Sequence, residues 1–255
     1  MNRRHFLLSA MSTPLFAQSA NNTPQREYYE LRTFHLRNGN HSPRMFELLQ
    51  QWTTAAGRIG QGAVGVFQPV IGEDSPSVLM VSVFANPEAA TGSFDRLMDD
   101  KEFATAYRKA NSPEPAFTRM ESSLYRAFSG FPALKRPQGR DGGATHLFEL
   151  RTYESNSMIS LRTKIEMFNS GEIAIFERLG MKPVFFGESM FGNRQPCLTY
   201  MLAYDDLEAR DRVWKAFVSD PEWTKMKGKP GYSDAEIVSN ISNSILRPLA
   251  FSGVR

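Results

Sequence analysis

Two pairs of charged residues are the features of this sequence best suited to hold or transform a ligand. Glu30 and Arg32 stand two residues apart, and Glu149 and Arg151 repeat that spacing in the second half of the chain. If both segments are strands, each pair lies side by side on one sheet face, because successive side chains alternate between the faces. An arginine held by a carboxylate can bind an anion. The alternatives are a structural salt bridge and two exposed charges at the rim of a sheet.

Glu172 is a further candidate because it interrupts the apolar stripe of a predicted helix. Aligning the two halves of the chain places it opposite Trp52. A carboxyl group there could meet Arg151 in a cleft between sheet and helix, where burial would raise its pKa and the arginine would lower it. Its protonation state is therefore left open. Alternatively, Gly171 distorts the helix and turns Glu172 to solvent.

Other reactive residues are scarce. Outside the first 20 residues the histidines are His35, His41 and His146, and none has metal-ligand spacing to another histidine, a cysteine or a carboxylate. A single histidine could still hold a haem iron, although a capping or surface role is commoner. The one cysteine, Cys197, begins an apolar run with no histidine near it, which favours core packing. No metal site, confident catalytic residue or cofactor is therefore predicted.

The segments that carry the charged pairs are parts of an internal repeat. Residues 30–34 (ELRTF) recur as 149–153 (ELRTY), 100–103 (DKEF) as 220–223 (DPEW), and 124–128 (LYRAF) as 245–249 (ILRPL). The offsets are 119, 120 and 121 residues, in the same order along the chain. Such regular self-similarity indicates a tandem duplication.

Each copy is predicted to fold as β-α-β-β-α-β. In the first copy, residue patterns predict strands over 27–35, 64–71, 78–84 and 119–128, a helix capped by Ser42, and a helical stretch over 87–108 in two pieces. This order is the ferredoxin-like arrangement, in which both helices cover one face of a four-stranded antiparallel sheet. The other face must also be covered. We therefore predict an α+β protein in which two ferredoxin-like units, 26–128 and 145–251, pack sheet to sheet across a linker of residues 129–144.

The first 20 residues predict an export signal of the twin-arginine type. An arginine pair is followed at fixed spacing by Phe-Leu, then by a short apolar run and small residues that allow cleavage between Ala17 and Ala20. The residues of this signal are Arg3, Arg4, Phe6 and Leu7. The apolar run is shorter than the roughly 20 residues that span a bilayer. We expect a periplasmic or secreted protein that uses the twin-arginine machinery and is not an integral membrane protein; a disordered tail or a membrane anchor is the alternative.

Composition argues against a nucleic-acid partner. The formal net charge is +3, and loss of Arg3 and Arg4 with the signal would reduce it to +1. The sequence also lacks a stripe of basic residues interleaved with aromatic residues, the pattern that would favour nucleic-acid binding. The hydrophobic content of 41% and charged content of 22% are ordinary for a globular domain.

Several of the repeated motifs resemble the NIPSNAP family. These are the paired ELRT-aromatic segments, DPEW at 220–223 and ILRPL at 245–249, and the resemblance extends over residues 26–250. It implies membership of the dimeric α/β-barrel superfamily, with two ferredoxin-like units forming a barrel. It implies little chemistry, because the family has no agreed activity, and the mitochondrial and vesicle-traffic roles of animal relatives do not suit an exported protein. The wider superfamily includes haem-degrading oxygenases, cofactor-free monooxygenases, chlorite dismutases and peroxidases, an analogy that cannot assign function.

Two functional hypotheses follow. The first is a binding protein that holds a small molecule or a partner protein at a sheet–helix cleft. The alternative is a cofactor-free or haem-using oxygenase or isomerase that works in the cleft lined by Glu149, Arg151 and Glu172. The first is favoured, because the sequence contains no acid–base or metal constellation.

Overall fold

The computed structural model describes residues 25–39, 41–139 and 144–255. The predicted export motif, Arg3, Arg4, Phe6 and Leu7, lies outside these residues and stays a prediction. Within the described ranges, none of the helices combines the length and the apolar character needed to cross a membrane.

Eight antiparallel strands form one closed barrel, in the order β1-β3-β2-β8-β5-β7-β6-β4. The first repeat contributes β1 (Tyr28–His35), β2 (Val64–Ile71), β3 (Ser77–Phe84) and β4 (Arg119–Ala127). The second contributes β5 (Leu147–Glu154), β6 (Lys182–Phe191), β7 (Cys197–Tyr204) and β8 (Asn240–Pro248). The predicted class, two tandem ferredoxin-like units in a barrel-like body, is confirmed.

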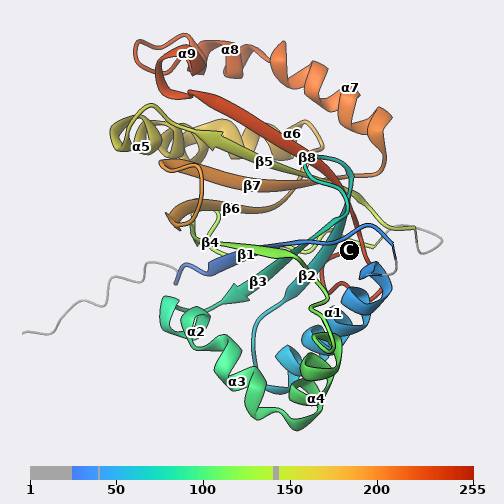
Figure 1. Ribbon diagram of the computed structural model, residues 1–255. Coiled ribbons are helices and arrows are strands. Elements are labelled where there is room, and N and C mark those ends of the chain that lie inside the picture. The colour runs from blue at the N-terminus through green and yellow to red at the C-terminus, as the bar shows by residue number, and fades with distance from the viewer. Residues whose placement is uncertain (1–24, 40, 140–143) are drawn as a thin grey trace, which may run out of the picture.

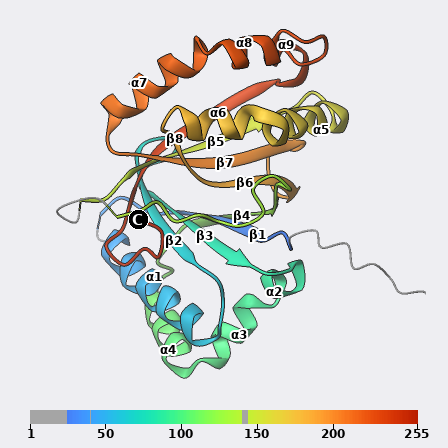
Figure 2. The ribbon, with the colours of Figure 1, turned by 180° about the vertical axis from the view of Figure 1, so that it is seen from behind.

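The helices lie outside the barrel in two layers on opposite sides (Figures 1 and 2). The first layer contains α1 (His41–Arg58), α2 (Pro87–Thr91), α3 (Ser93–Asp99) and α4 (Lys101–Ala110). The second contains α5 (Met158–Met167), the π-helical turn η2 (Phe168–Glu172), α6 (Ile173–Arg178), α7 (Leu207–Val218), α8 (Pro221–Lys227) and α9 (Asp234–Ile237). Each layer covers the outer face of its own repeat's sheet.

The two sheets join edge to edge, which turns their uncovered faces into the barrel interior. Strand β2 pairs with β8 through Phe67 and Pro248, and β4 pairs with β6 through Ala127 and Gly187. Closure leaves no unpaired sheet edge, the feature that makes open sheets prone to aggregate. One end of the interior is filled by apolar side chains, with ring centroids 4.9 Å apart for Tyr29–Phe185 and 5.0 Å apart for Phe67–Phe148.

The opposite end of the barrel is called the mouth. Because neighbouring strands are antiparallel, β1, β2, β5 and β6 all point the same way and end there. Two equivalent turns therefore meet at the mouth: residues 72–76 between β2 and β3, and residues 192–196 between β6 and β7. Asp74 and Arg194 occupy the same position in these turns, with positive φ angles of 50° and 65°.

Local details differ from the sequence predictions. Helix α1 begins at His41, so Ser42 lies inside its first turn and does not cap it. The stretch 87–108 contains three helices where two were predicted, because the chain breaks at Gly92 and again at Asp100, whose side chain caps α4. The first part of the predicted linker 129–144 packs against the second repeat: Phe131 is buried in that repeat's outer core.

Candidate functional site

Glu149 lies at the centre of a buried polar network in the second repeat. Its side chain is fully buried on the outer face of β5, beneath α7. It accepts hydrogen bonds from Arg151 Nη1 at 2.9 Å and from Arg210 at 2.6 and 3.0 Å. Further donors lie at 3.0 to 3.2 Å: Trp214 Nε1, Asn243 Nδ2 and the Tyr204 hydroxyl. Every acceptor site of this carboxylate is therefore occupied by protein groups.

The charge state of Glu149 follows from these contacts. Burial would raise its pKa, but the hydrogen bonds from Arg210 and the charges of Arg151 and Arg210 outweigh burial and hold the pKa below its ordinary value. Arg151 also stacks over Trp214, with its guanidinium carbon 4.5 Å from the ring centroid. Its Nη2 donates to the Tyr153 hydroxyl at 3.3 Å. The network therefore holds a fixed carboxylate between two arginines.

A second buried ion pair lies on the neighbouring helix. Lys164 and Glu172 are both 1% exposed, and Lys164 Nζ lies 3.2 Å from Glu172 Oε2. Burial raises the pKa of Glu172, whereas the carboxylates of Glu172 and Asp234 raise the pKa of Lys164 against the effect of burial. The Lys164 ammonium also lies 5.0 Å from the ring centroid of Trp223, a residue of the repeated DPEW motif. The Lys164 ammonium therefore lies between two carboxylates, Glu172 at 3.2 Å and Asp234 at 3.3 Å, within an otherwise aromatic layer.

The structure excludes the solvent-exposed alternative for Glu172 and gives the buried carboxylate a different ion-pair partner from the one expected. The helix is distorted by η2 at Gly171, but Glu172 stays buried. Its ion-pair partner is Lys164, where the sequence suggested Arg151. Lys164 was missed, although it stands three residues after Leu161 and four before Phe168, inside the apolar stripe of that helix. A lysine at such a position is a signal of a buried charge.

One buried polar atom in this layer, Arg151 Nε, has no hydrogen-bond partner among the described residues. The buried Glu172 Oε2 makes no hydrogen bond of acceptable geometry either, but it lies 3.2 Å from Lys164 Nζ in the ion pair. Aromatic rings pack closely in the same layer: Tyr200, whose hydroxyl donates to Tyr153 at 2.9 Å, lies 5.4 Å from Phe186 between ring centroids. Because buried polar groups are nearly always paired, Arg151 Nε requires an explanation.

The equivalent layer of the first repeat is simpler. Arg32 Nε donates to Glu30 Oε1 at 2.7 Å, and Ser122 donates to the same oxygen at 2.7 Å. Trp52 lies over Arg32 at 5.1 Å and packs against Phe34. The registers of the sheet show what differs between the repeats: Arg32 stands opposite Met80 and Ser122, whereas Arg151 stands opposite Tyr200 and Asn243.

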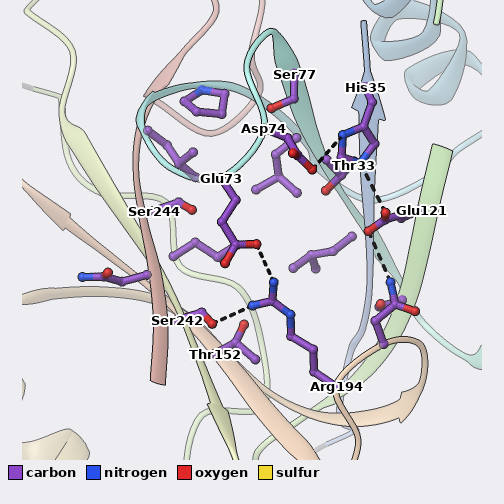
Figure 3. Close-up of a pocket in the computed structure, with 18 of the residues that line it drawn as sticks. Thr33, His35, Glu73, Asp74, Ser77, Glu121, Thr152, Arg194, Ser242 and Ser244 are labelled. Atoms are coloured by element: carbon purple, nitrogen blue, oxygen red, sulfur yellow. Dashed lines mark hydrogen bonds and ion pairs between the residues drawn. The ribbon is translucent and has the colours of Figure 1, made fainter. Parts of the chain in front are cut away.

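A separate cavity of about 190 Å³ opens at the mouth of the barrel. Charged side chains bridge its rim (Figure 3). Arg194 donates to Glu73 and to Ser242, both at 2.6 Å, and Asn193 donates to Glu121 at 3.2 Å. Sequence reasoning missed these residues, because the turns that carry them are far apart in the chain and meet only when the barrel closes.

Two of the described histidines lie at other places in the barrel. His35 lies at the mouth, 3.4 Å from Asp74 and from Glu121. His146 is buried beside Lys182. The described residues also contain no group of three or more metal-ligating side chains.

The closed barrel and the helix layer on each side of it define a dimeric α/β-barrel fold, in which one chain supplies both ferredoxin-like units. The NIPSNAP family model matches residues 29–131 and 148–253. The chain belongs to the NIPSNAP family. No curated protein matches it.

Two solved structures show the same fold at low identity. A proposed monooxygenase from Lactobacillus acidophilus NCFM is 10% identical with a TM-score of 0.59, over 88% of this chain and 94% of that one. A proposed monooxygenase from Fusobacterium nucleatum has the same identity and TM-score, over 89% and 94%. A NIPSNAP-like domain protein from Burkholderia xenovorans is 23% identical, covering 42% of this chain and 89% of that one, with a TM-score of 0.38.

Proposed function

We propose that this chain is an exported binding protein that takes a small molecule between the sheet and the helices of its second repeat. The observation that carries the proposal is the buried Arg151 Nε, a donor without a hydrogen-bond partner among the described residues, in the same layer as the Lys164–Glu172 ion pair. A ligand that offers an acceptor would satisfy Arg151 Nε, and a donor on the same ligand could share the Glu172 carboxylate with Lys164. In the first repeat, Trp52 takes the position aligned with Glu172.

The surroundings select the class of ligand. Phe168, Phe186 and Tyr200 are fully buried and form contacting aromatic rings in this layer. A flat apolar molecule with a hydroxyl or carbonyl group matches such a layer. These rings fill the layer in the structure, so binding requires the helices above it to move outward. The π-helical turn η2 is the element suited to that movement, because π-turns interrupt regular helix bonding and occur frequently at functional sites. A partner protein is the other occupant that the binding hypothesis allows.

The enzymatic alternative is an oxygenase or isomerase acting in the same layer. It is supported by the fold likeness to two proposed monooxygenases, and by the Lys164–Glu172 pair, which could move a proton to or from a bound ring. The cofactor-free form needs only this acid–base pair, whereas the haem-using form would also need an iron ligand.

Ligand retention tests the proposal. The exported protein is purified without denaturation and examined by native mass spectrometry. We expect a retained small molecule in the natural protein and its loss in Lys164→Met, Glu172→Gln, which removes both charges together. The matched control is Glu30→Gln, Arg32→Met in the first repeat, which should retain the ligand. Absence of any retained mass, or equal loss in the control, contradicts the proposal; a haem absorption band would favour the haem-using alternative.

Export is proposed on the sequence motif alone. Replacing Arg3 and Arg4 together with Lys should leave the precursor in the cytoplasm, because the machinery recognises the arginines rather than positive charge. Fractionation and immunoblotting would measure this. Normal periplasmic delivery of the double-lysine variant would exclude the twin-arginine route.

A further inference from the structure

The mouth of the barrel is a second built cavity, distinct from the network between sheet and helices. Most of the residues that line it face the interior from both repeats, while Glu149 and Arg151 lie on the outer face of β5 and Glu172 lies in η2. Asn243, whose side chain donates to Glu149, is the lining residue that the two places share. The apolar floor of the cavity contains Leu31 and Leu150, which are equivalent positions in the two repeats. The cavity therefore lies on the axis that relates the repeats.

Hydroxyl groups form the wall above this floor. Thr33 and Thr152 are equivalent positions in β1 and β5, and Ser123 and Ser244 are equivalent positions in β4 and β8. Ser77, from β3, is only 5% exposed yet also lines the cavity. Figure 3 shows Thr33, Ser77, Thr152 and Ser244 arranged around the opening.

Several of these hydroxyls are available to a ligand. Thr33, Ser77 and Ser244 make no side-chain hydrogen bond to another residue in the described part of the chain, whereas Thr152 bonds Thr199 at 2.8 Å. A hydroxyl both donates and accepts. The wall therefore offers bonds of either polarity without a fixed charge.

The charges at the rim are already paired with one another. Glu73 is bound by Arg194 at 2.6 Å. Asp74 and Glu121 lie 3.2 and 3.0 Å from Arg119. A charged ligand would have to break one of these pairs, whereas a neutral ligand leaves them intact. The two turns carry complementary charges at equivalent positions, Asp74 in one repeat and Arg194 in the other.

We infer that the mouth binds a neutral polyhydroxylated molecule of about monosaccharide size. Its hydroxyls would exchange hydrogen bonds with Thr33, Ser77 and Ser244, and its apolar edge would rest on the leucine floor. Arg194, in the turn between β6 and β7 with a φ of 65°, bridges the rim beside it by donating to Glu73 and Ser242. An arginine in this left-handed region is uncommon.

The test uses saturation-transfer NMR on the purified exported protein, with D-glucose and myo-inositol as neutral probes and glucosamine and glucuronate as charged ones. We expect binding of a neutral probe and at least about tenfold weaker binding of both charged probes. The variant Thr33→Val, Ser244→Ala removes two hydroxyls from the wall and should weaken binding about tenfold, as two lost hydrogen bonds would. The matched control, Thr54→Val, Ser219→Ala, removes two helix-surface hydroxyls and should change nothing.

Each other outcome overturns the inference. No transfer to either neutral probe at tens of millimolar excludes the ligand class, and stronger binding of a charged probe does the same. If binding survives Thr33→Val, Ser244→Ala but is lost in Lys164→Met, Glu172→Gln, the ligand belongs to the network of the second repeat. Should the double variant fail to fold, Ser77→Ala replaces it, with the same loss expected.

Discussion

At the scale of the residue, the two Glu–Arg pairs are equivalent in sequence and different in structure. Glu149 is fully buried, with Arg151 and Arg210 as counter-charges, whereas Glu30 has only Arg32 and a serine and remains about one-eighth exposed (12%). A buried charge is tolerated only when it is paired and hydrogen-bonded. The two glutamates should therefore differ in what their removal does to stability.

Glu149→Gln should lower the free energy of unfolding by about 3–5 kcal/mol, because it leaves two arginines beside a site without its carboxylate. Glu30→Gln should lower it by about 1.5–3 kcal/mol, the range for one hydrogen bond to a charged group. Urea unfolding followed by circular dichroism measures both. Equal losses would mean that the burial of Glu149 does not increase its contribution to stability.

The pKa shifts of Glu149 and Glu172 predict opposite dependences on pH. The pKa of Glu149 is held below its ordinary value of 4.5, so its stabilising effect is present above that value and is lost as pH falls through the folded pKa. The pKa of Glu172 is raised by burial, so its contribution is present below 4.5 and is lost as pH rises through the folded pKa. The free energy of unfolding should be measured between about pH 3 and 8. Compared with the natural protein, Glu149→Gln should lose less stability as the pH falls, and Glu172→Gln should lose less stability as the pH rises above 4.5. Parallel curves for the natural protein and both variants would contradict these assignments.

At the scale of the element, the repeated motifs turn out to be structural devices. In the DPEW and DKEF segments the aspartate caps the helix that follows: Asp220 accepts from the Trp223 amide at 3.1 Å, and Asp100 from the Phe103 amide at 2.9 Å. Each also binds the last residue of an earlier helix in the same layer, Arg178 of α6 or Arg58 of α1. The motif therefore joins two helices of one layer.

Asp220→Ala should lower the denaturation midpoint, because it removes both the cap of α8 and the ion pair to Arg178. Asp220→Asn keeps a capping oxygen and should lose less. Asp100→Ala and Asp100→Asn provide the matched series in the first repeat. Thermal denaturation would decide: if Ala and Asn have the same effect in both repeats, capping is not the function of the motif.

Helices and strands could be predicted from the sequence where a local residue pattern determines them. The network around Glu149 could not be predicted in this way. Alternation and apolar spacing in 27–35 and 45–59 indicated the first strand and helix, and repetition extended them to the second copy. Apart from Arg151, the partners of Glu149 come from α7, β7 and β8, 50 or more residues away, and only tertiary packing selects them. Glu172 was found because it broke a stripe; Lys164 broke the same stripe and was not recognised.

At the scale of the whole molecule, duplication within one chain accomplishes what two subunits would otherwise do. The interior of the barrel mixes residues of both repeats, for example Phe67 packed on Phe148 and Tyr29 packed on Phe185. Both seams, β2 with β8 and β4 with β6, also join one repeat to the other. Neither repeat can therefore bury its inner face alone. The same arrangement creates the mouth, which has a complete rim only when the two turns face each other.

Expressing one repeat alone should expose this dependence. Residues 25–139 would present β2 and β4 as unpaired edges and Tyr29, Phe67 and Val83 as an uncovered apolar face, so we expect a dimer or an aggregate by light scattering. Co-expression with residues 144–255 should restore a soluble one-to-one complex, because the missing strands then close the barrel. Two copies of residues 25–139 could close a barrel with each other, so a dimer would agree with the prediction. A stable, soluble monomer of 25–139 would show that the repeats fold as independent domains and that the barrel is only their packing arrangement.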